Sequence, residues 1–226
     1  MTRETFDLEL RRLQDSLLDL GSQVQEALAG AVAALVARNL DKASEIMAQD
    51  AVINTHRFAL EEQCLLLIAT QQPLASDLRT VAAVLDITSN LERMADHAKG
   101  IAKITIMLGH EPLIKPLVDI PVMAHKAGEM LAEALDAFVH RDVKAARALP
   151  KRDDEIDAYY DQIYRELLSH MLADPRTINQ ATLLLWITHN IERFADRVTN
   201  ICERVVFTVT GEMRELDQKE PESPNT

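Results

Sequence analysis

Aromatic residues and glycine are scarce in this chain, and their scarcity argues against a fold of short strands and turns. Aromatic residues make up 4% of the 226 positions, and only six positions are glycine. Strands favour aromatic and β-branched side chains, whereas alanine and leucine, both abundant here, are strong helix formers. The composition therefore predicts a protein of long helices.

Cysteine and long apolar runs are also nearly missing. Cys64 and Cys202 are isolated in the sequence, so they form neither a disulfide framework nor a thiolate metal site. We interpret both as buried, inert thiols in a reducing compartment. The longest apolar run, residues 27–37, is far shorter than the roughly 20 residues that span a bilayer. Because no secretion signal is visible either, we expect a cytoplasmic protein without an inserted membrane segment.

Basic residues are outnumbered by acidic ones. The chain has 24 Lys and Arg against 36 Asp and Glu, which gives a formal net charge of −12. Nucleic acids bind to surfaces rich in lysine and arginine, so this balance argues against a nucleic-acid partner. It suits metal cations or a basic protein surface, although solubility alone would also explain it.

Apolar residues recur at steps of three and four along most of the chain, which is the period of amphipathic helices. Residues 109–117 interrupt this pattern with a glycine and two prolines and form the predicted linker. We expect an all-α fold with two tandem antiparallel three-helix bundles, in residues 1–108 and 118–210. The helices of the second bundle are expected near 118–139, 142–172 and 177–209. Residues 211–226 are polar and are expected to be disordered.

One motif occurs twice, one hundred positions apart. Asn90-Leu-Glu92-Arg93-Met-Ala-Asp96 returns as Asn190-Ile-Glu192-Arg193-Phe-Ala-Asp196. Upstream, residues 50–54 match residues 153–157 at an offset of 103. A constant offset over two helices, followed by a local loss of three residues, indicates a duplication.

Each copy of the motif carries two carboxylates one helical turn apart, on the same face of the helix. A helical wheel places them on the flank of the apolar stripe, where one helix meets its neighbour. The preceding helix supplies a matching row of polar side chains in each half. These rows are Asp50, Asn54 and Glu61 in the first half, and Asp153, Asp157 and Asp161 in the second.

Paired flanks would gather four or more oxygen ligands in each bundle. Carboxylates this close repel one another unless a cation lies between them. Oxygen ligands favour magnesium, manganese, calcium or ferric iron, so the sequence predicts two matching metal sites. Two other interpretations stay open. An arginine could offset the repulsion, and a Glu and an Asp four residues apart can be a solvated helix face with surface ion pairs.

Three further residues stand near the motifs. His189 precedes Glu192 by three positions and is a possible ligand, although the first half has no histidine there. His97 follows Asp96 and fits a surface role. Core packing is the simplest expectation for Trp186, with an interface anchor as the alternative.

These features together resemble the PhoU family, the accessory and regulatory proteins of bacterial phosphate-specific transport. The resemblance rests on Pro73-Leu-Ala-Ser-Asp77-Leu-Arg79 and on residues 90–97 and 190–197, and it covers nearly the whole chain except the tail. It implies two similar three-helix bundles whose Glu/Asp-x-x-x-Asp motifs are associated with metal clusters of iron, zinc, manganese or magnesium. The implied ligands are Glu92 with Asp96, Glu192 with Asp196, and Asp153 with Asp157.

This chain departs from the family pattern at two places. Asn54 replaces the second carboxylate after Asp50, so the first site has one charge less and is expected to bind metal more weakly or not at all. The second half also has no charged counterpart of Asp77 and Arg79, because residues 177–179 are uncharged.

The resemblance implies a negative regulator of the phosphate-starvation response. Such a protein contacts the ATPase subunit of the phosphate transporter and the phosphate sensor histidine kinase, and restrains both when phosphate is plentiful. We also expect a homodimer. The alternatives are a carboxylate-bridged metalloenzyme in a helical bundle and an adaptor that binds no metal. The Glu-x-x-His motifs of di-iron enzymes, the nucleophile elbow and the phosphate-binding glycine loop are all missing, so we expect no enzyme.

Overall fold

The computed structural model describes residues 3–216, which form an all-α structure, as predicted. Helices of the first half pack as one three-helix bundle, and those of the second half pack as another. The first-half helices are α1 (Arg3–Ala37), α2 (Leu40–Gln71) and α3 (Ser76–Leu108). The second-half helices are α4 (Asp119–His140), α5 (Val143–Ala148), η1 (Leu149–Arg152), α6 (Asp153–Ala173), η2 (Pro175–Thr177) and α7 (Ile178–Thr210).

The first turn of each half is built in the same way. Arg38 and Arg141, which are 103 positions apart, adopt the left-handed conformation with φ of 56° and 54°. The next residues, Asn39 and Asp142, each accept a hydrogen bond from a backbone amide in the first turn of the following helix. Both turns therefore use a left-handed residue and an N-cap at matching positions, which supports the duplication.

The expectation of one continuous helix over residues 142–172 is wrong. The chain forms the short helix α5, one 3-10 turn, and then α6. Pro150 lies in the 3-10 turn, and a proline has no amide hydrogen and clashes with the preceding helical turn. The helix therefore begins again at Asp153, with acidic side chains in its first turn, where the helix dipole favours them.

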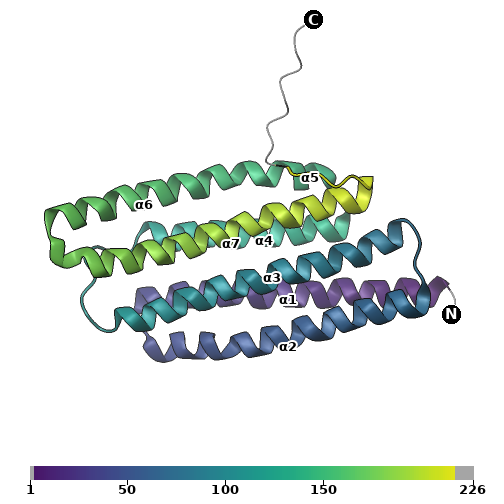
Figure 1. Ribbon diagram of the computed structural model, residues 1–226, viewed down its shortest axis with the longest axis horizontal. Helices are drawn as coiled ribbons and strands as arrows, with labels where there is room; N and C mark the ends of the chain where they lie inside the picture. The colour runs from purple at the N-terminus through teal and green to yellow at the C-terminus, as the bar shows by residue number, and fades with distance from the viewer. Residues whose placement is uncertain (1–2, 217–226) are drawn as a thin grey trace, which may run out of the picture.

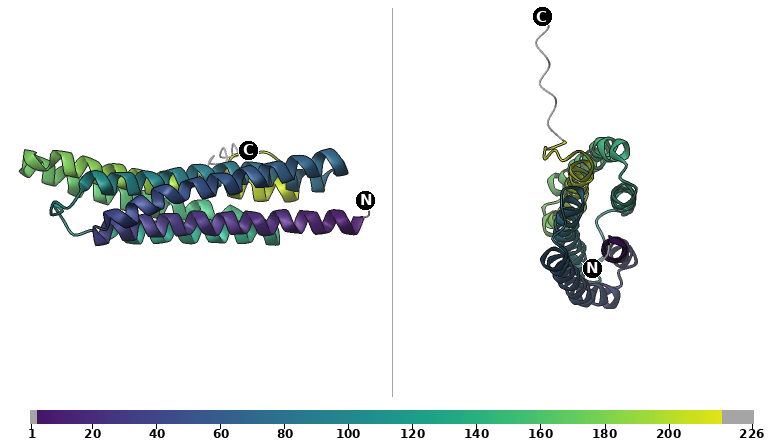
Figure 2. Two further views of the ribbon diagram at one scale, coloured as in Figure 1. Left: turned by 90° about the horizontal axis from the view of Figure 1, so that it is seen from below. Right: turned by 90° about the vertical axis from the view of Figure 1, so that its right-hand side faces the viewer.

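The two bundles lie side by side along their length (Figure 1). Between them, α3 packs against α7 and α1 packs against α4. Seen end-on in Figure 2, α2, α3, α7 and α6 form a curved outer layer, and α1 and α4 lie on its inner side. Buried apolar residues from both bundles belong to one continuous core. The bundles are therefore joined by packing as well as by the linker.

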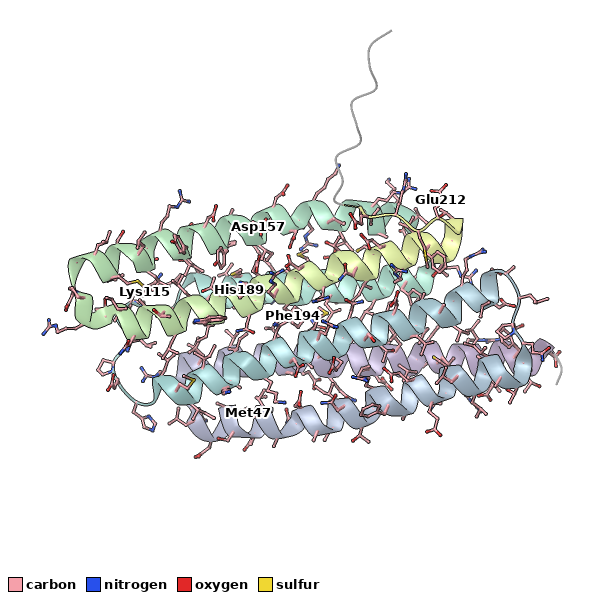
Figure 3. All side chains as sticks on the ribbon, viewed as in Figure 1. Met47, Lys115, Asp157, His189, Phe194 and Glu212 are labelled. Carbon is pink, nitrogen blue, oxygen red and sulfur yellow. The ribbon has the colours of Figure 1, made fainter. Side chains whose placement is uncertain are left out.

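The linker is held at several points. The Gln180 side chain on α7 accepts a hydrogen bond from the Ile114 amide at 2.5 Å and donates one to the Pro112 carbonyl at 2.9 Å. The Lys115 ammonium, only 8% exposed, donates a hydrogen bond to Glu166 on α6. Figure 3 labels Lys115 beside α6. These contacts fix the linker against the second bundle.

Two expectations concern the ends of the chain. By length and composition, α1 could cross a membrane, but half of its most apolar stretch is buried inside the protein. Residues 211–216 were expected to be disordered, yet the Leu216 amide donates a hydrogen bond to Glu203 on α7 at 3.1 Å. Residues 217–226, for which disorder is also expected, lie outside the described residues.

Gly21 permits close contact between α1 and α4, because a Cβ there would overlap Leu135 Cδ1. We expect Gly21→Val to lower the free energy of unfolding by about 1–3 kcal/mol, the usual cost of overpacking. Ser22→Val adds the same side chain one position along, where the surface is exposed, and should change it by less than about 0.5 kcal/mol. Denaturant unfolding followed by circular dichroism measures both. Equal stability of the two variants would contradict the contact between the bundles.

Candidate metal centre

Four carboxylates of the second bundle lie on α6 and α7, which pack together. Asp153 and Asp157 are in the first two turns of α6, and Glu192 and Asp196 are one turn apart on α7. Asp157 is exposed to solvent on one side, yet partial desolvation raises its pKa and the Asp196 carboxylate raises it further. Burial also raises the pKa of Glu192, with Asp196 and Asp157 adding to the effect. The structure therefore brings Asp157, Glu192 and Asp196 close enough to repel one another.

Histidine and arginine flank these acids. Glu192 Oε2 is shielded from solvent and makes no hydrogen bond, although His189 Nδ1 lies 3.2 Å away. Arg193 donates a hydrogen bond to Asp196 at 3.0 Å, and His189 and Arg193 partly oppose the rise in the pKa of Glu192. The ring of Tyr160 on α6 meets His189 edge-on, with 6.4 Å between centroids. Figure 3 labels Asp157 on α6 and His189 on α7.

In the first bundle, a lysine contacts the matching acids. Lys99 Nζ on α3 donates a hydrogen bond to Asp50 Oδ2 on α2 at 2.7 Å, and the Asn54 amide donates one to the same oxygen at 3.2 Å. The hydrogen bond to Asp50 raises the pKa of Lys99 against the effect of burial, and the charges of Asp50, Asp96 and Glu92 raise it further. Lys99 therefore contacts Asp50 directly, and the charges of Asp96 and Glu92 add to the rise in its pKa.

An arginine contacts two more acids of this bundle. Arg57 Nε donates a hydrogen bond to Glu61 Oε1 at 3.0 Å, and Arg57 Nη1 lies 3.4 Å from Glu92 Oε1. This is the alternative that the sequence left open, in which a basic side chain offsets the repulsion between acids. The acidic row of the first bundle thus contacts a lysine and an arginine from the paired helices α2 and α3.

The asparagines of the two motifs lie between the bundles. Asn200 on α7 donates a hydrogen bond to Asn90 on α3 at 3.1 Å. The Asn190 side-chain oxygen lies 3.2 Å from His97 Nδ1, and a Cβ on Gly100 would approach the same oxygen to 2.9 Å. Positions 90 and 190 therefore face positions 200 and 100, in an antiparallel register about the middle of the two motifs.

The same register extends toward the end of α7. Arg204 Nη1 lies 3.1 Å from Asp86 Oδ2, and Arg79 contacts the Thr208 carbonyl. Phe194, labelled in Figure 3, is completely buried. In each motif the asparagine thus serves the contact between α3 and α7, while the carboxylates on the flank turn toward the neighbouring helix of their own bundle.

The family model for the PhoU domain matches residues 17–105 and, a second time, residues 120–205. The chain belongs to the PhoU family. Both matched segments contain one copy of the Glu/Asp motif, so each bundle is one PhoU domain. The resemblance inferred from the motifs is confirmed.

Relatives and solved structures agree with this assignment. A phosphate-specific transport system accessory protein PhoU homolog of Streptococcus pneumoniae is 38% identical over 215 residues, covering 95% of this chain and all of the relative. A homolog of the same name from Caulobacter vibrioides is 36% identical, covering 97% of this chain and 95% of its own length. Names of this kind describe accessory proteins, in agreement with the expectation of no enzyme.

Two crystal structures have the same fold. The phosphate transport system regulatory protein PhoU from Streptococcus pneumoniae aligns with a TM-score of 0.86 at 37% identity, covering 92% of this chain and 99% of that one. PhoU from Pseudomonas aeruginosa aligns with a TM-score of 0.86 at 31% identity, covering 92% of this chain and all of that one.

The second PhoU domain has the better donor set for a metal. In residues 3–216, no three His, Cys, Asp or Glu side chains lie close enough together to hold an ion as they stand. In the second domain, however, three acids repel one another and Glu192 has a buried oxygen without a hydrogen bond. In the first domain Asp50 and Glu92 contact Lys99 and Arg57, and this set does not fit a metal.

Other motif residues lie outside the acidic regions. Arg93 is exposed. Asp77 is in the first turn of α3, about 22 Å along the helix from Glu92 at 1.5 Å per residue. Asp161 is exposed one turn beyond Asp157, where its charge adds to the rise in the pKa of Asp157.

Two expectations for single residues are wrong. Trp186 is 56% exposed rather than packed in the core, and its ring meets His189 edge-on with 6.0 Å between centroids. His97 is half-buried between the bundles rather than on the open surface, and burial lowers its pKa. Sequence reasoning also missed Lys99 and Arg57, which an alignment of the two halves would have revealed as charges present in only one of them.

The hydrogen bond between Asn200 and Asn90 should contribute to the contact between the bundles. We expect Asn200→Ala to lower the free energy of unfolding by about 0.5–1.5 kcal/mol, the usual net value of one hydrogen bond. Asn179→Ala, an exposed position on the same helix, is the control and should change little. Urea unfolding at constant metal content measures both variants. An Asn200→Ala protein as stable as the control would contradict this role.

Proposed function

We propose that this PhoU-family protein is a negative regulator of the phosphate-starvation response. It acts through protein–protein contacts with the ATPase subunit of the phosphate transporter and with the phosphate sensor histidine kinase. The observation that carries the proposal is full-length similarity to proteins named as accessory and regulatory proteins of phosphate transport. The net charge of −12, which disfavours nucleic acid, supports regulation through proteins rather than through DNA. The cytoplasm, where both partners expose their catalytic domains, is the proposed compartment.

Metal binding is the second part of the proposal. We assign a cation to the second bundle, held by Glu192 and Asp196 from α7 and by Asp153 and Asp157 from α6. The raised pKa values of Asp157 and Glu192 support it, because a cation among these oxygens would relieve their repulsion. Carboxylate oxygens suit hard cations such as magnesium, manganese and ferric iron, and His189 nearby widens the choice to zinc. The cation would supply charge neutralisation and would tie α6 to α7.

A second copy of the chain is the third proposed partner, on the outer face of α2. Within residues 3–216 this helix packs only against α1 and α3, and its outer face carries Val52, Phe58, Leu65 and Leu66, each about 60% exposed. Exposed residues recur there at steps of three and four, the spacing of a helix–helix seam. They are Ala48, Ala51, Thr55, Phe58, Glu62, Leu65 and Ala69.

In the proposed dimer, two such seams pair in antiparallel directions. The small residues Ala48 and Ala51 at one end would face Ala69 and Leu65 of the second copy. The seam is about 31 Å long at 1.5 Å per residue, and a two-fold axis repeats every contact. A second copy of the chain is therefore the partner proposed for this seam.

Affinity capture tests the regulatory assignment. The tagged full chain, recovered from cells grown in high phosphate, should bring down the transporter ATPase subunit or the sensor kinase, identified by mass spectrometry. Deleting the gene should also switch on phosphate-starvation genes while phosphate is plentiful. Repression that persists after the deletion would exclude a negative regulator.

The acidic pair of the second bundle provides the test for metal. Glu192→Ala with Asp196→Ala should abolish metal binding to that bundle, leave helix content unchanged and derepress phosphate-starvation genes. Asp15→Ala with Asp19→Ala removes two exposed acids at the same spacing on α1 and is the matched control. Metal content by plasma mass spectrometry and reporter expression are measured together. Unchanged metal content in the first double variant would remove the site assignment and favour an adaptor without metal.

The dimer proposal predicts a change of mass. Leu65→Glu with Leu66→Glu places two charges in the α2 seam, and the protein should become monomeric by light scattering after gel filtration. Leu172→Glu alters another exposed leucine, 78% exposed at the end of α6, and should leave the dimer intact. A monomeric wild-type protein would refute the seam.

A further inference from the structure

The two acidic regions come from one ancestral sequence but differ in the charges around them. At the offsets of 103 and 100, Arg57 aligns with Tyr160, and Lys99 aligns with Thr199. Asn54 aligns with Asp157. At all three positions the first bundle has the more positive or less negative residue. These three differences shift the local charge in the same direction, whereas Glu61 aligned with Tyr164 and His97 aligned with Arg197 shift it the other way.

The first bundle contains its own cations. The Lys99 ammonium is bonded to Asp50, whose side chain is only 11% exposed, and the Glu92 and Asp96 carboxylates also act on this ammonium. The Arg57 guanidinium lies between Glu61 and Glu92. Both basic groups come from helices that also carry the acids, so they are present at every metal concentration. An ammonium and a metal ion cannot occupy the same position among these oxygens.

The second bundle has neutral residues at the corresponding positions. Tyr160 replaces the arginine; its ring meets His189 edge-on, and burial and the Glu192 charge raise the pKa of its hydroxyl. Thr199 replaces the lysine, and its hydroxyl oxygen is buried without a hydrogen-bond partner in the described part of the chain. The second bundle therefore lacks the lysine and the arginine that contact Asp50, Glu61 and Glu92 in the first.

We propose that Lys99 and Arg57 take the place of metal in the first bundle, so that metal binding by this protein is confined to the second. This inference rests on the metal site proposed above. A metal ion entering the first bundle would have to displace the Lys99 ammonium from Asp50 and leave that positive charge beside itself. In the second bundle the ion instead relieves repulsion between acids. One bundle is then a metal-independent structural copy, and the other responds to metal supply.

A transplant of residues between the bundles tests the inference. Arg57→Tyr, Lys99→Thr and Asn54→Asp together give the first bundle the residues of the second. They are introduced into the chain carrying Glu192→Ala and Asp196→Ala, whose own site is removed. Equilibrium dialysis of the folded protein against Mn²⁺, with metal per chain measured by plasma mass spectrometry, should show binding restored from near zero. Lys103→Thr, an exposed lysine one turn beyond Lys99, should restore nothing.

The reverse substitution keeps the test decisive if the transplant fails to fold. Tyr160→Arg puts a guanidinium near Glu192 at a partly exposed position, and it should weaken Mn²⁺ binding at least about tenfold, the lower range for changes beside a metal site. Either a folded transplant that binds no Mn²⁺ or an unaltered affinity in Tyr160→Arg would overturn the inference.

Mn²⁺ binding by the wild-type protein and by the variants also separates this inference from the metal site proposed for the second bundle. Wild-type protein that binds no Mn²⁺ would refute the metal site of the second bundle, whereas a transplant that still gains Mn²⁺ would support the role of Lys99 and Arg57. If Glu192→Ala with Asp196→Ala removes only half of the bound Mn²⁺, the first bundle also binds metal. That outcome would overturn the inference and leave the proposed function intact.

Discussion

The antiparallel contact between α3 and α7 is the constraint on which the other features depend. It buries the apolar faces of both helices in one core and fixes the register of the two motifs through Asn90, Asn190 and Asn200. Once that register is set, the carboxylates on the flanks turn away from the contact, toward α2 in one bundle and α6 in the other. The same motif therefore has two roles. Its asparagine contacts the other bundle, and its acids lie on the flank away from that contact.

Charge compensation then distinguishes the two copies. Acids brought together at a helix flank need a counter-charge, and it can come from a side chain or from solution. In the first bundle the counter-charge comes from the side chains of Lys99 and Arg57. In the second, His189 and Arg193 contact Glu192 and Asp196 from the same helix, and the pKa of Glu192 stays raised. Divergence after duplication thus changed the electrostatics while each half kept the arrangement of a three-helix bundle.

Much of the fold could be predicted from the sequence, because helix period, capping residues and an internal repeat are local signals. Pro150 also indicated a helix break, but the apolar pattern around it favoured a continuous helix. Contacts between residues far apart in the chain could not be predicted from the sequence. Nothing in the sequence indicated that Lys99 would reach Asp50, that Trp186 would be 56% exposed, or that the motif asparagines would meet across two bundles. For the candidate site, the sequence identified the acids, while their partners depended on the packing of helices.

The register of α3 and α7 also bears on how such a chain arose. Position 90 faces 200 and position 190 faces 100, so the two halves are related by an approximate two-fold axis through the join. Each half alone would expose the apolar surface that the other now covers. The two halves thus cover each other's apolar surfaces as two identical chains do in a two-fold dimer, and the segment at 109–117 makes that association permanent. Gly100, which replaces the asparagine found at position 200, marks where the former symmetry has been lost.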